Sequence, residues 1–208
     1  MSKRRWFFLL LSIILITGCT SKTSEELFEP QKATTLTIKP HKLNKQEIDL
    51  VNHTGIDYID FYELDGTLKG NDDIHLVVDV YEKGKLVEEQ PFTSNVVQYS
   101  YDHSIWSIGL NKQDNFLEII HGVEDGYMSS SHEVQVQGYT MDSLLTEKVK
   151  LKKNKPVPLF AWAGTNGNGI SSINLDENGN PAGGIGDSDL AYVYKIILTE
   201  RVSKKETE

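Results

Sequence analysis

The chain has 208 residues and a formal charge of −9, and its apolar (38%) and charged (25%) fractions are those of a soluble globular protein. A single cysteine excludes a disulfide within the chain, and neither a collagen-like nor a heptad repeat is present. Nucleic-acid binding requires a positive surface, so the acidic balance argues against it.

The first 18 residues have the three parts of a secretory signal peptide. Residues 2–5 are basic, residues 6–16 are apolar apart from Ser12, and the small residues Thr17 and Gly18 follow. A membrane-spanning helix needs about 20 apolar residues, so this run is too short for one.

Residues 16–19 read Ile-Thr-Gly-Cys and resemble the lipobox of bacterial lipoproteins. In that family the cysteine thiol is joined to diacylglycerol and the peptide bond before it is cut. The resemblance implies cleavage between Gly18 and Cys19 and a lipid on Cys19. It covers the targeting segment alone, and Ile16 and Thr17 are mild departures from the preferred Leu and Ala or Ser.

We therefore expect a lipid-anchored protein on the extracytoplasmic face of the cell membrane. Removal of residues 1–18, which carry three basic residues and no acidic one, takes the formal charge from −9 to −12. A polybasic patch would then not explain membrane residence, and the lipid would have to supply it. Residues 19–32 read as the lipidated cysteine and a polar tether, 33–202 as the extracytoplasmic domain, and 203–208 as a charged tail.

From residue 33 onward apolar residues recur every second position, as in half-buried strands. Residues 74–81 show this clearly, and the turn at 82–85 predicts a hairpin with a strand starting at 86. Residues 56–64 predict a strand that ends in a hairpin turn at Asp65-Gly66. The other expected strands span 96–101, 105–110, 116–121, 134–140, 157–162 and 190–199. Residues 43–51 fit a short helix or a strand equally well.

This pattern predicts an all-β fold: an antiparallel sandwich or barrel, with an immunoglobulin-like sandwich as the first choice on strand count. No internal repeat and no second domain boundary is visible.

Residues 164–186 hold seven of the sixteen glycines and form the longest stretch without a strand pattern. Loops of this length are usually functional or disordered. Two interpretations stay open: a binding loop at one end of the sandwich, or a mobile excursion without a ligand. Few large apolar side chains lie here, so we expect the segment to add little to the core. The candidate binding residues are Trp162, Asn166, Asn168, Asp176, Asn178, Asn180 and Asp187.

Other motifs have simpler explanations. Residues 148–155 contain five lysines and suit an edge strand protected against aggregation better than a polyanion site. Asp102-His103-Ser104 has the residue types of a hydrolase triad, but adjacent strand residues point to opposite faces. Calcium-loop spacing begins at Asp176, with Pro181 where that loop needs glycine. The histidines show no zinc-site spacing. Aromatic side chains that suit a carbohydrate platform are more often core residues at strand spacing: Tyr58, Tyr62, Tyr99, Tyr101 and Trp106.

We expect a membrane-anchored lipoprotein whose domain binds something rather than transforms it, because no catalytic, metal or cofactor motif is found. Its partner would be a protein or a component of the cell envelope. The alternatives are a hydrolase acting on envelope material and an accessory subunit of a transporter, sensor or secretion complex.

Overall fold

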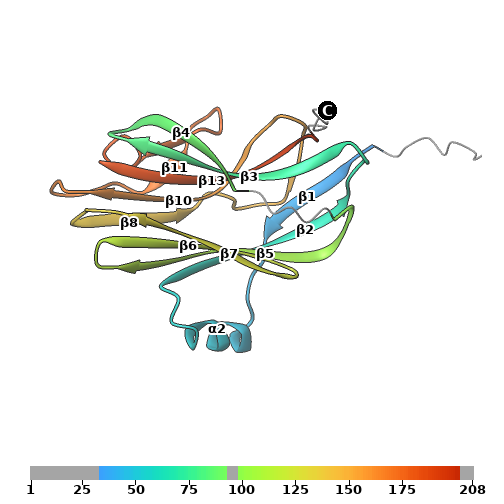
Figure 1. The fold of residues 1–208 in the computed structure, drawn as a ribbon, viewed down its shortest axis with the longest axis horizontal. Helices are drawn as coiled ribbons and strands as arrows, with labels where there is room; N and C mark the ends of the chain where they lie inside the picture. The colour runs from blue at the N-terminus through green and yellow to red at the C-terminus, as the bar shows by residue number, and fades with distance from the viewer. Residues whose placement is uncertain (1–32, 93–97, 202–208) are drawn as a thin grey trace, which may run out of the picture. The chain divides into compact units, whose positions relative to one another are not determined.

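The computed structural model describes residues 33–92 and 98–201. Two antiparallel sheets lie face to face (Figure 1). The six-stranded sheet has the order β7-β6-β5-β2-β1-β9 and consists of β1 (Thr35–Pro40), β2 (Tyr58–Thr67), β5 (Ser100–Gln113), β6 (Phe116–Val123), β7 (Gly126–Glu133) and β9 (Val149–Lys150). The five-stranded sheet has the order β4-β3-β13-β10-β8 and consists of β3 (Asp72–Glu82), β4 (Lys85–Phe92), β8 (Gly138–Ser143), β10 (Val157–Thr165) and β13 (Leu190–Glu200).

The main core fills the space between the two sheets. Alternate residues of each strand point into it, such as Leu36 and Ile38 on β1 and Phe160 and Trp162 on β10, and all four are almost fully buried. This alternation is what two half-buried sheets require. The prediction of an all-β antiparallel sandwich is confirmed.

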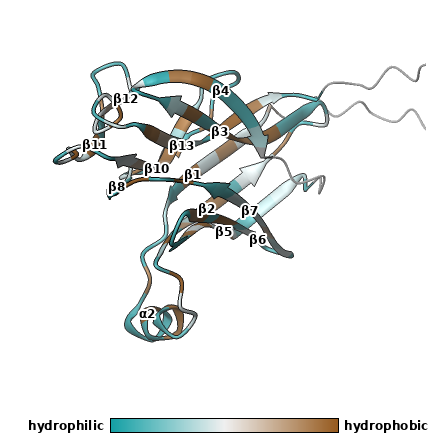
Figure 2. Ribbon diagram, turned by 60° about the vertical axis from the view of Figure 1, so that its left-hand side comes forward, coloured by the Kyte–Doolittle hydropathy of each residue, from teal (hydrophilic) through white to brown (hydrophobic). Residues whose placement is uncertain are grey.

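Residues 43–51, which the sequence left undecided, contain the helix α2 (Lys45–Asn52). The Asn44 side chain accepts hydrogen bonds from the backbone of Gln46 and Glu47, and the Glu47 carboxylate accepts one from the Asn44 N–H, so a capping box starts the helix. The helix lies away from both sheets on two extended connections and shows apolar as well as polar residues (Figure 2).

The predicted hairpin turn at Asp65-Gly66 is wrong, because β2 continues through both residues to Thr67. Gly66 has a φ of +124°, and a Cβ there would lie 1.6 Å from the Thr35 carbonyl oxygen. The dipeptide lies at a β-bulge opposite β5, between Leu64 and Gly66. Glycine is needed at this position for the close approach of β1 rather than for a turn.

Other strand boundaries also differ from the prediction. The strands expected at 105–110 and at the described end of 96–101 are one strand, β5. The strand expected at 134–140 begins at Gly138, and β7 was not predicted because its serines break the apolar alternation. The hairpin at 82–85 is confirmed: Lys83 and Gly84 both have positive φ, as a tight turn between β3 and β4 requires.

Candidate functional site

The Gly-rich segment 164–186 folds onto the outer face of the five-stranded sheet as a small third layer. It contains a hairpin of β11 (Ile173–Leu175) and β12 (Pro181–Gly183). Ile173 and Ile185 are 4% and 3% exposed and form a second apolar cluster with Leu144, which follows β8, and with outward-facing residues of the sheet: Ala161, Ala163, Ala191 and Val193. The expectation that this segment adds little to the core is therefore wrong.

Small side chains make this covering layer possible. Ala161 and Ala163 on β10, and Ala191 on β13, leave room for the segment to lie directly on the strands. Glycine serves the same purpose within the segment, since a Cβ at Gly184 would lie 2.2 Å from the Ser171 carbonyl oxygen. The glycines thus serve close packing here as well as conformational freedom.

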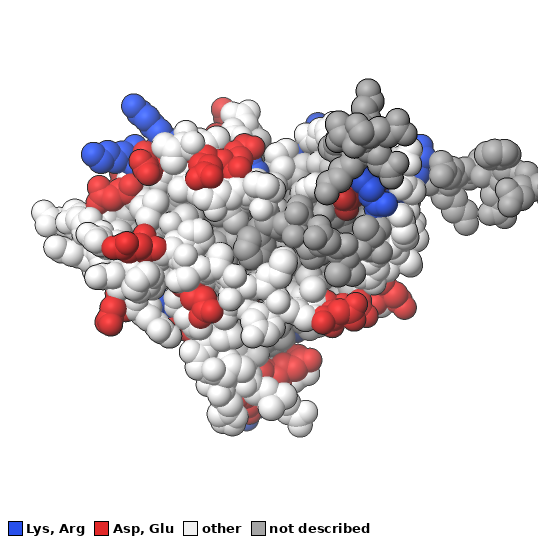
Figure 3. All heavy atoms as spheres, in the orientation of Figure 1, with Lys and Arg blue, Asp and Glu red and all other residues white. Residues whose placement is uncertain are grey.

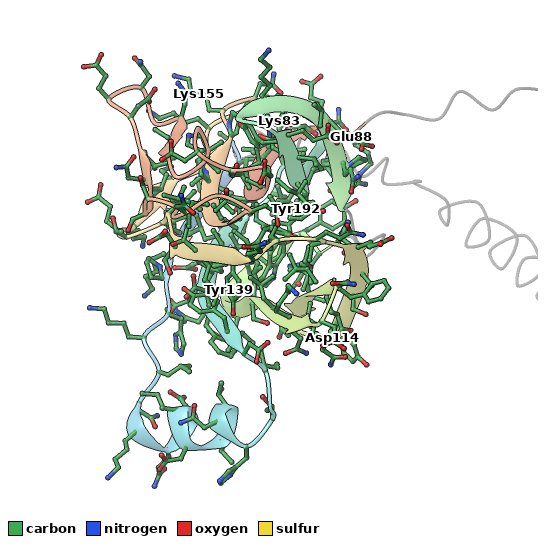
Figure 4. The ribbon with its side chains drawn as sticks, turned by 90° about the vertical axis from the view of Figure 1, so that its left-hand side faces the viewer. Lys83, Glu88, Asp114, Tyr139, Lys155 and Tyr192 are labelled. Carbon is green, nitrogen blue, oxygen red and sulfur yellow. The ribbon has the colours of Figure 1, made fainter. Side chains whose placement is uncertain are left out.

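Beside this apolar contact the layer leaves a hollow of about 540 Å³, within the range of small-molecule sites. Its lining comes from β3, β4, β13, the start of β10 with the segment before it, and the tip of the β11–β12 hairpin: Asp79, Tyr81, Leu86, Asn154, Lys155, Pro156, Pro158, Asn178, Gly179, Asn180, Pro181, Val193 and Lys195. In Figure 4, Lys155 and Lys83 lie on the side of the five-stranded sheet, and Asp114 lies on the side of the six-stranded sheet.

An ion pair forms the floor of the hollow. The Lys195 Nζ lies 2.6 Å from Asp79 Oδ1 and 2.7 Å from Oδ2, and it also donates to Glu89 at 3.1 Å. Lys195 and Asp79 are both buried, whereas Glu89 is more exposed. Burial alone would lower the pKa of Lys195, but its bonds to the two carboxylates raise it. The Lys195 Nζ is therefore engaged by two carboxylates, and burial raises the pKa of Asp79 despite its bond to Lys195.

The rim of the hollow offers neutral hydrogen-bonding groups. Asn178 and Asn180 are at the tip of the hairpin, in a turn held by Asp176. The Asp176 carboxylate accepts the backbone N–H groups of both asparagines at 2.8 Å, and these bonds, with that of the Asn180 side chain, lower its pKa. Asp176 thus organises a turn, which accounts for the oxygen-rich spacing that resembled a calcium loop. Tyr81 lines the hollow from β3, and Asn178 lines it from the turn, where its side chain also bonds to Asp176.

The structure brings only two of the predicted loop residues, Asn178 and Asn180, to the hollow. Trp162 is a core residue, 1% exposed. Asn166 donates hydrogen bonds to Asp189 and to the Gln135 carbonyl, Asp187 accepts one from Ser171, and Asn168 is exposed. Sequence reasoning missed Tyr81 and the ion pair, because they lie on strands far from the Gly-rich segment in the chain.

A second charged cluster lies on the six-stranded sheet and centres on Glu63. Its carboxylate lies 2.9 Å from Lys39 Nζ, 2.5 Å from His103 Nδ1 and 3.8 Å from His41 Nδ1. His103 has a φ of +53° at the β-bulge opposite Asp65. Hydrogen bonds from His103 and Lys39 lower the pKa of Glu63 to about 2, and the bond to Glu63 raises the pKa of His103.

The contacts of this cluster show that Asp102-His103-Ser104 does not form a hydrolase triad. The His103 ring bonds to Glu63, whereas the Ser104 hydroxyl donates to Glu124 at 2.8 Å, so the two side chains have different partners. Next to the cluster, a smaller groove of about 260 Å³ lies between the sheet and α2, lined by His41, Leu43, Glu47, Leu50, Val51, Phe61 and Ile105.

The lysine-rich segment 148–155 lies at a sheet edge, as its composition predicted. β9 pairs with β1 and is the outermost strand, Leu151 is buried, and Lys153 forms ion pairs with Asp72 and Glu200. On the face shown in Figure 3 acidic side chains predominate over basic ones.

The aromatic residues Tyr62 and Tyr101 are core residues, and Tyr58 and Trp106 pack against that core.

Two properties of residues 33–92 and 98–201 bear on the remaining expectations. No group of three or more His, Cys, Asp or Glu side chains in these ranges is placed to hold a metal ion. None of their helices has the length and apolarity to cross a membrane. Gly18, Cys19 and the tether lie outside the described residues.

Comparison with known proteins gives one match. The model of the YgaN domain family matches residues 37–198, which include the strands that line the hollow and those that hold Glu63. No curated protein and no solved structure matches the chain. The immunoglobulin-like variant of the sandwich therefore stays a prediction.

Proposed function

The chain belongs to the YgaN domain family, and we propose that it is a lipoprotein, anchored through Cys19 to the extracytoplasmic face of the cell membrane, whose β domain binds a ligand. The observation that carries the binding role is the hollow of about 540 Å³ under the β11–β12 hairpin. It combines apolar walls with a few polar groups, as small-molecule sites do.

The lining favours a ligand rich in hydroxyl and amide groups. Asp79 and Lys195 form an ion pair on the floor, and Lys155 adds one basic side chain to the lining. Three prolines and Tyr81 supply apolar walls, and Asn154, Asn178 and Asn180 supply amides. A short envelope glycan bearing acetamido groups fits this combination, because its ring faces are apolar and its edges form hydrogen bonds.

The test is titration of the domain with the tetramer of N-acetylglucosamine, followed by calorimetry and by NMR shifts. Tyr81→Phe and Asn178→Ala should each weaken binding about fivefold to tenfold, since each removes one hydrogen-bonding group of a net worth near 1 kcal/mol. The matched control is Asn168→Ala, an exposed asparagine of the same segment outside the hollow. No binding, or equal losses in all three variants, would reject the glycan site.

The anchor is tested separately. Cys19 is the only cysteine in the chain, so Cys19→Ala should abolish incorporation of labelled fatty acid and leave uncleaved precursor. A variant that still carries lipid and is processed normally would refute the lipoprotein assignment while leaving glycan binding untouched.

An accessory role in a membrane complex is the second candidate, supported by the apolar side chains of α2. Ile48 and Leu50 are 46% and 67% exposed on a helix that buries no residue. In this case a photo-reactive residue placed at position 48 would cross-link a partner, and Leu50→Ser in the same chain would abolish that cross-link and leave glycan binding unchanged.

A further inference from the structure

The two sheets have four edges, and three of them are protected against pairing with another strand. β9 has two residues and is flanked by lysines. β4 carries Pro91 and several charged residues. The third edge strand, β8, lies against the Gly-rich layer, where the Asp142 carboxylate accepts the Ile173 N–H at 2.8 Å. Lysine, proline and covering segments are the devices by which proteins prevent edge-to-edge association.

The fourth edge strand, β7, has none of these devices. It runs for eight residues, Gly-Tyr-Met-Ser-Ser-Ser-His-Glu, without lysine, arginine or proline, and its only charge is Glu133. Among the described residues its one strand partner is β6. Tyr127, near its start, is 75% exposed.

The β6–β7 pairing shows which backbone groups face outward. A two-residue turn joins Val123 to Gly126, which are directly paired. In such hairpins the closing pair exchanges both hydrogen bonds, and hydrogen-bonded and non-hydrogen-bonded pairs alternate along the ladder. The N–H and C=O groups of Tyr127, Ser129, Ser131 and Glu133 therefore face away from β6.

We propose that β7 pairs antiparallel with β7 of a second copy of this chain, in the register that places Ser130 opposite Ser130. A two-fold axis through this pair sets Tyr127 opposite Glu133 and Ser129 opposite Ser131. All four outward-facing residues of each strand then find a hydrogen-bonded partner. The six-stranded sheets of the two copies thereby become one continuous sheet. Met128 lies opposite His132 on the inner side.

Charge favours this register over its neighbours. No like charges lie opposite each other in it, whereas the register centred on Ser129 sets Glu133 opposite Asp125 of the other copy, and like charges directly opposite destabilise a sheet. The register centred on Ser131 leaves the outward groups of Tyr127 without a strand partner. The edge is thus self-complementary in one arrangement.

The experiment uses residues 33–208, which form a compact unit that contains both sheets and their core and has no cysteine. Single cysteines are introduced and oxidised. Directly opposed residues of a non-hydrogen-bonded pair have Cα atoms about 4.5 Å apart, within disulfide range. Ser130→Cys should form a covalent dimer several times faster than Ser129→Cys, whose thiols lie two residues out of register, and than Lys150→Cys on the protected edge.

A second variant tests pairing without cysteine. Ser129→Pro removes an outward N–H that β6 does not use, and edge strands tolerate proline. Sedimentation should show dimers of the unaltered domain that this variant loses while its far-UV spectrum stays the same. The proposal would be overturned by equal oxidation rates at residues 130 and 150, or by a domain that sediments as a monomer at every concentration. In either case the β7 edge would be available for pairing with a strand of another protein. Fastest oxidation at residue 129 would overturn the register.

Discussion

The outer faces of the two sheets differ: one is covered by a packed layer and the other is not. On the five-stranded sheet, the small residues Ala161, Ala163 and Ala191 accept a covering layer, which buries Ile173 and Ile185. On the six-stranded sheet, the ionic cluster around Glu63 lies on the face, and α2 lies beyond it without burying a single side chain. The outer face of the five-stranded sheet is therefore a covered face, with a third layer over it and a buried ion pair beneath the hollow. The outer face of the six-stranded sheet is an open face, with an ionic cluster and no covering layer.

In this contrast, the size and the charge of the outward-facing residues both bear on whether a sheet face is covered. Alanine and valine offer little apolar area to bury but permit backbone to lie close, whereas glutamate, lysine and histidine keep their charges near water. A Gly-rich segment can therefore be a packed layer where it lies on such a face. The first two predictions below compare a group on the covered face with a matched group on the open face, and the last two compare matched groups within the open face.

The largest expected effect comes from the buried ion pair. Lys195→Met should lower the free energy of unfolding by about 3–5 kcal/mol, because it leaves the Asp79 carboxylate buried without its partner. The double variant Lys195→Met/Asp79→Leu should recover most of that loss. The matched control is Lys39→Met, which removes a 40% exposed lysine from Glu63 and should cost no more than about 1 kcal/mol. Urea unfolding measures all three, and equal losses for the two single variants would contradict the contrast.

The covering layer itself supplies the next effect. Ile185→Ala should cost about 2–4 kcal/mol, the usual range for a buried isoleucine that leaves a cavity. On the open face, Ile48→Ala in α2 should change the free energy of unfolding by no more than about 0.5 kcal/mol, because that side chain is 46% exposed. If Ile185→Ala were equally mild, the segment would be an excursion after all, as one interpretation of the sequence allowed.

Much of the sandwich could be predicted because alternation along a strand is a local property. Residues 74–81 and 190–199 show it directly, and both are strands. The site could not be predicted in the same way, since Tyr81, Asp79 and Lys195 meet Asn178 only through strand order and the return of the hairpin. The alternation of large and small residues in Phe160-Ala161-Trp162-Ala163 was a usable signal that the outer face is covered.

Two errors have a shared cause. The Asp65-Gly66 dipeptide is the same whether it closes a hairpin or lies in a bulge, and only the approach of Thr35 from a neighbouring strand distinguishes the two. The same bulge turns His103 toward Glu63, so the Glu63 cluster was equally invisible in the sequence.

The pH dependence of stability should report on the Glu63 cluster of the open face. The folded pKa of Glu63, about 2, is below its ordinary value of 4.5, so its contribution is complete above pH 4.5 and is lost as pH falls towards 2. His103 has a raised pKa, so its contribution is complete below pH 6.5 and is lost as pH rises through the folded value.

Glu63→Gln should therefore flatten both limbs of the stability curve, since it removes the partner common to Lys39 and His103. The matched control is Glu118→Gln, a glutamate on β6 for which such a coupling to histidine is not seen. Urea midpoints from pH 2 to pH 9 supply the measurement. An acid limb that is as steep in Glu63→Gln as in the unaltered protein would show that Glu63 does not govern it.

The smallest effect on global stability is expected for the cap of α2. Asn44→Ala removes the capping box, which is worth about 1 kcal/mol to a helix. Because no residue of α2 is buried, this helix should unfold without the sandwich, so the urea midpoint of the domain should not move. Hydrogen exchange at Ile48, whose N–H bonds to the Asn44 carbonyl, should instead become about fivefold faster, the factor that 1 kcal/mol implies. Lys45→Ala, which leaves both capping side chains in place, serves as the control. A urea midpoint that falls together with the exchange protection would mean that α2 unfolds together with the sandwich. The open face would then carry a structural element that stabilises the domain, as the covered face does.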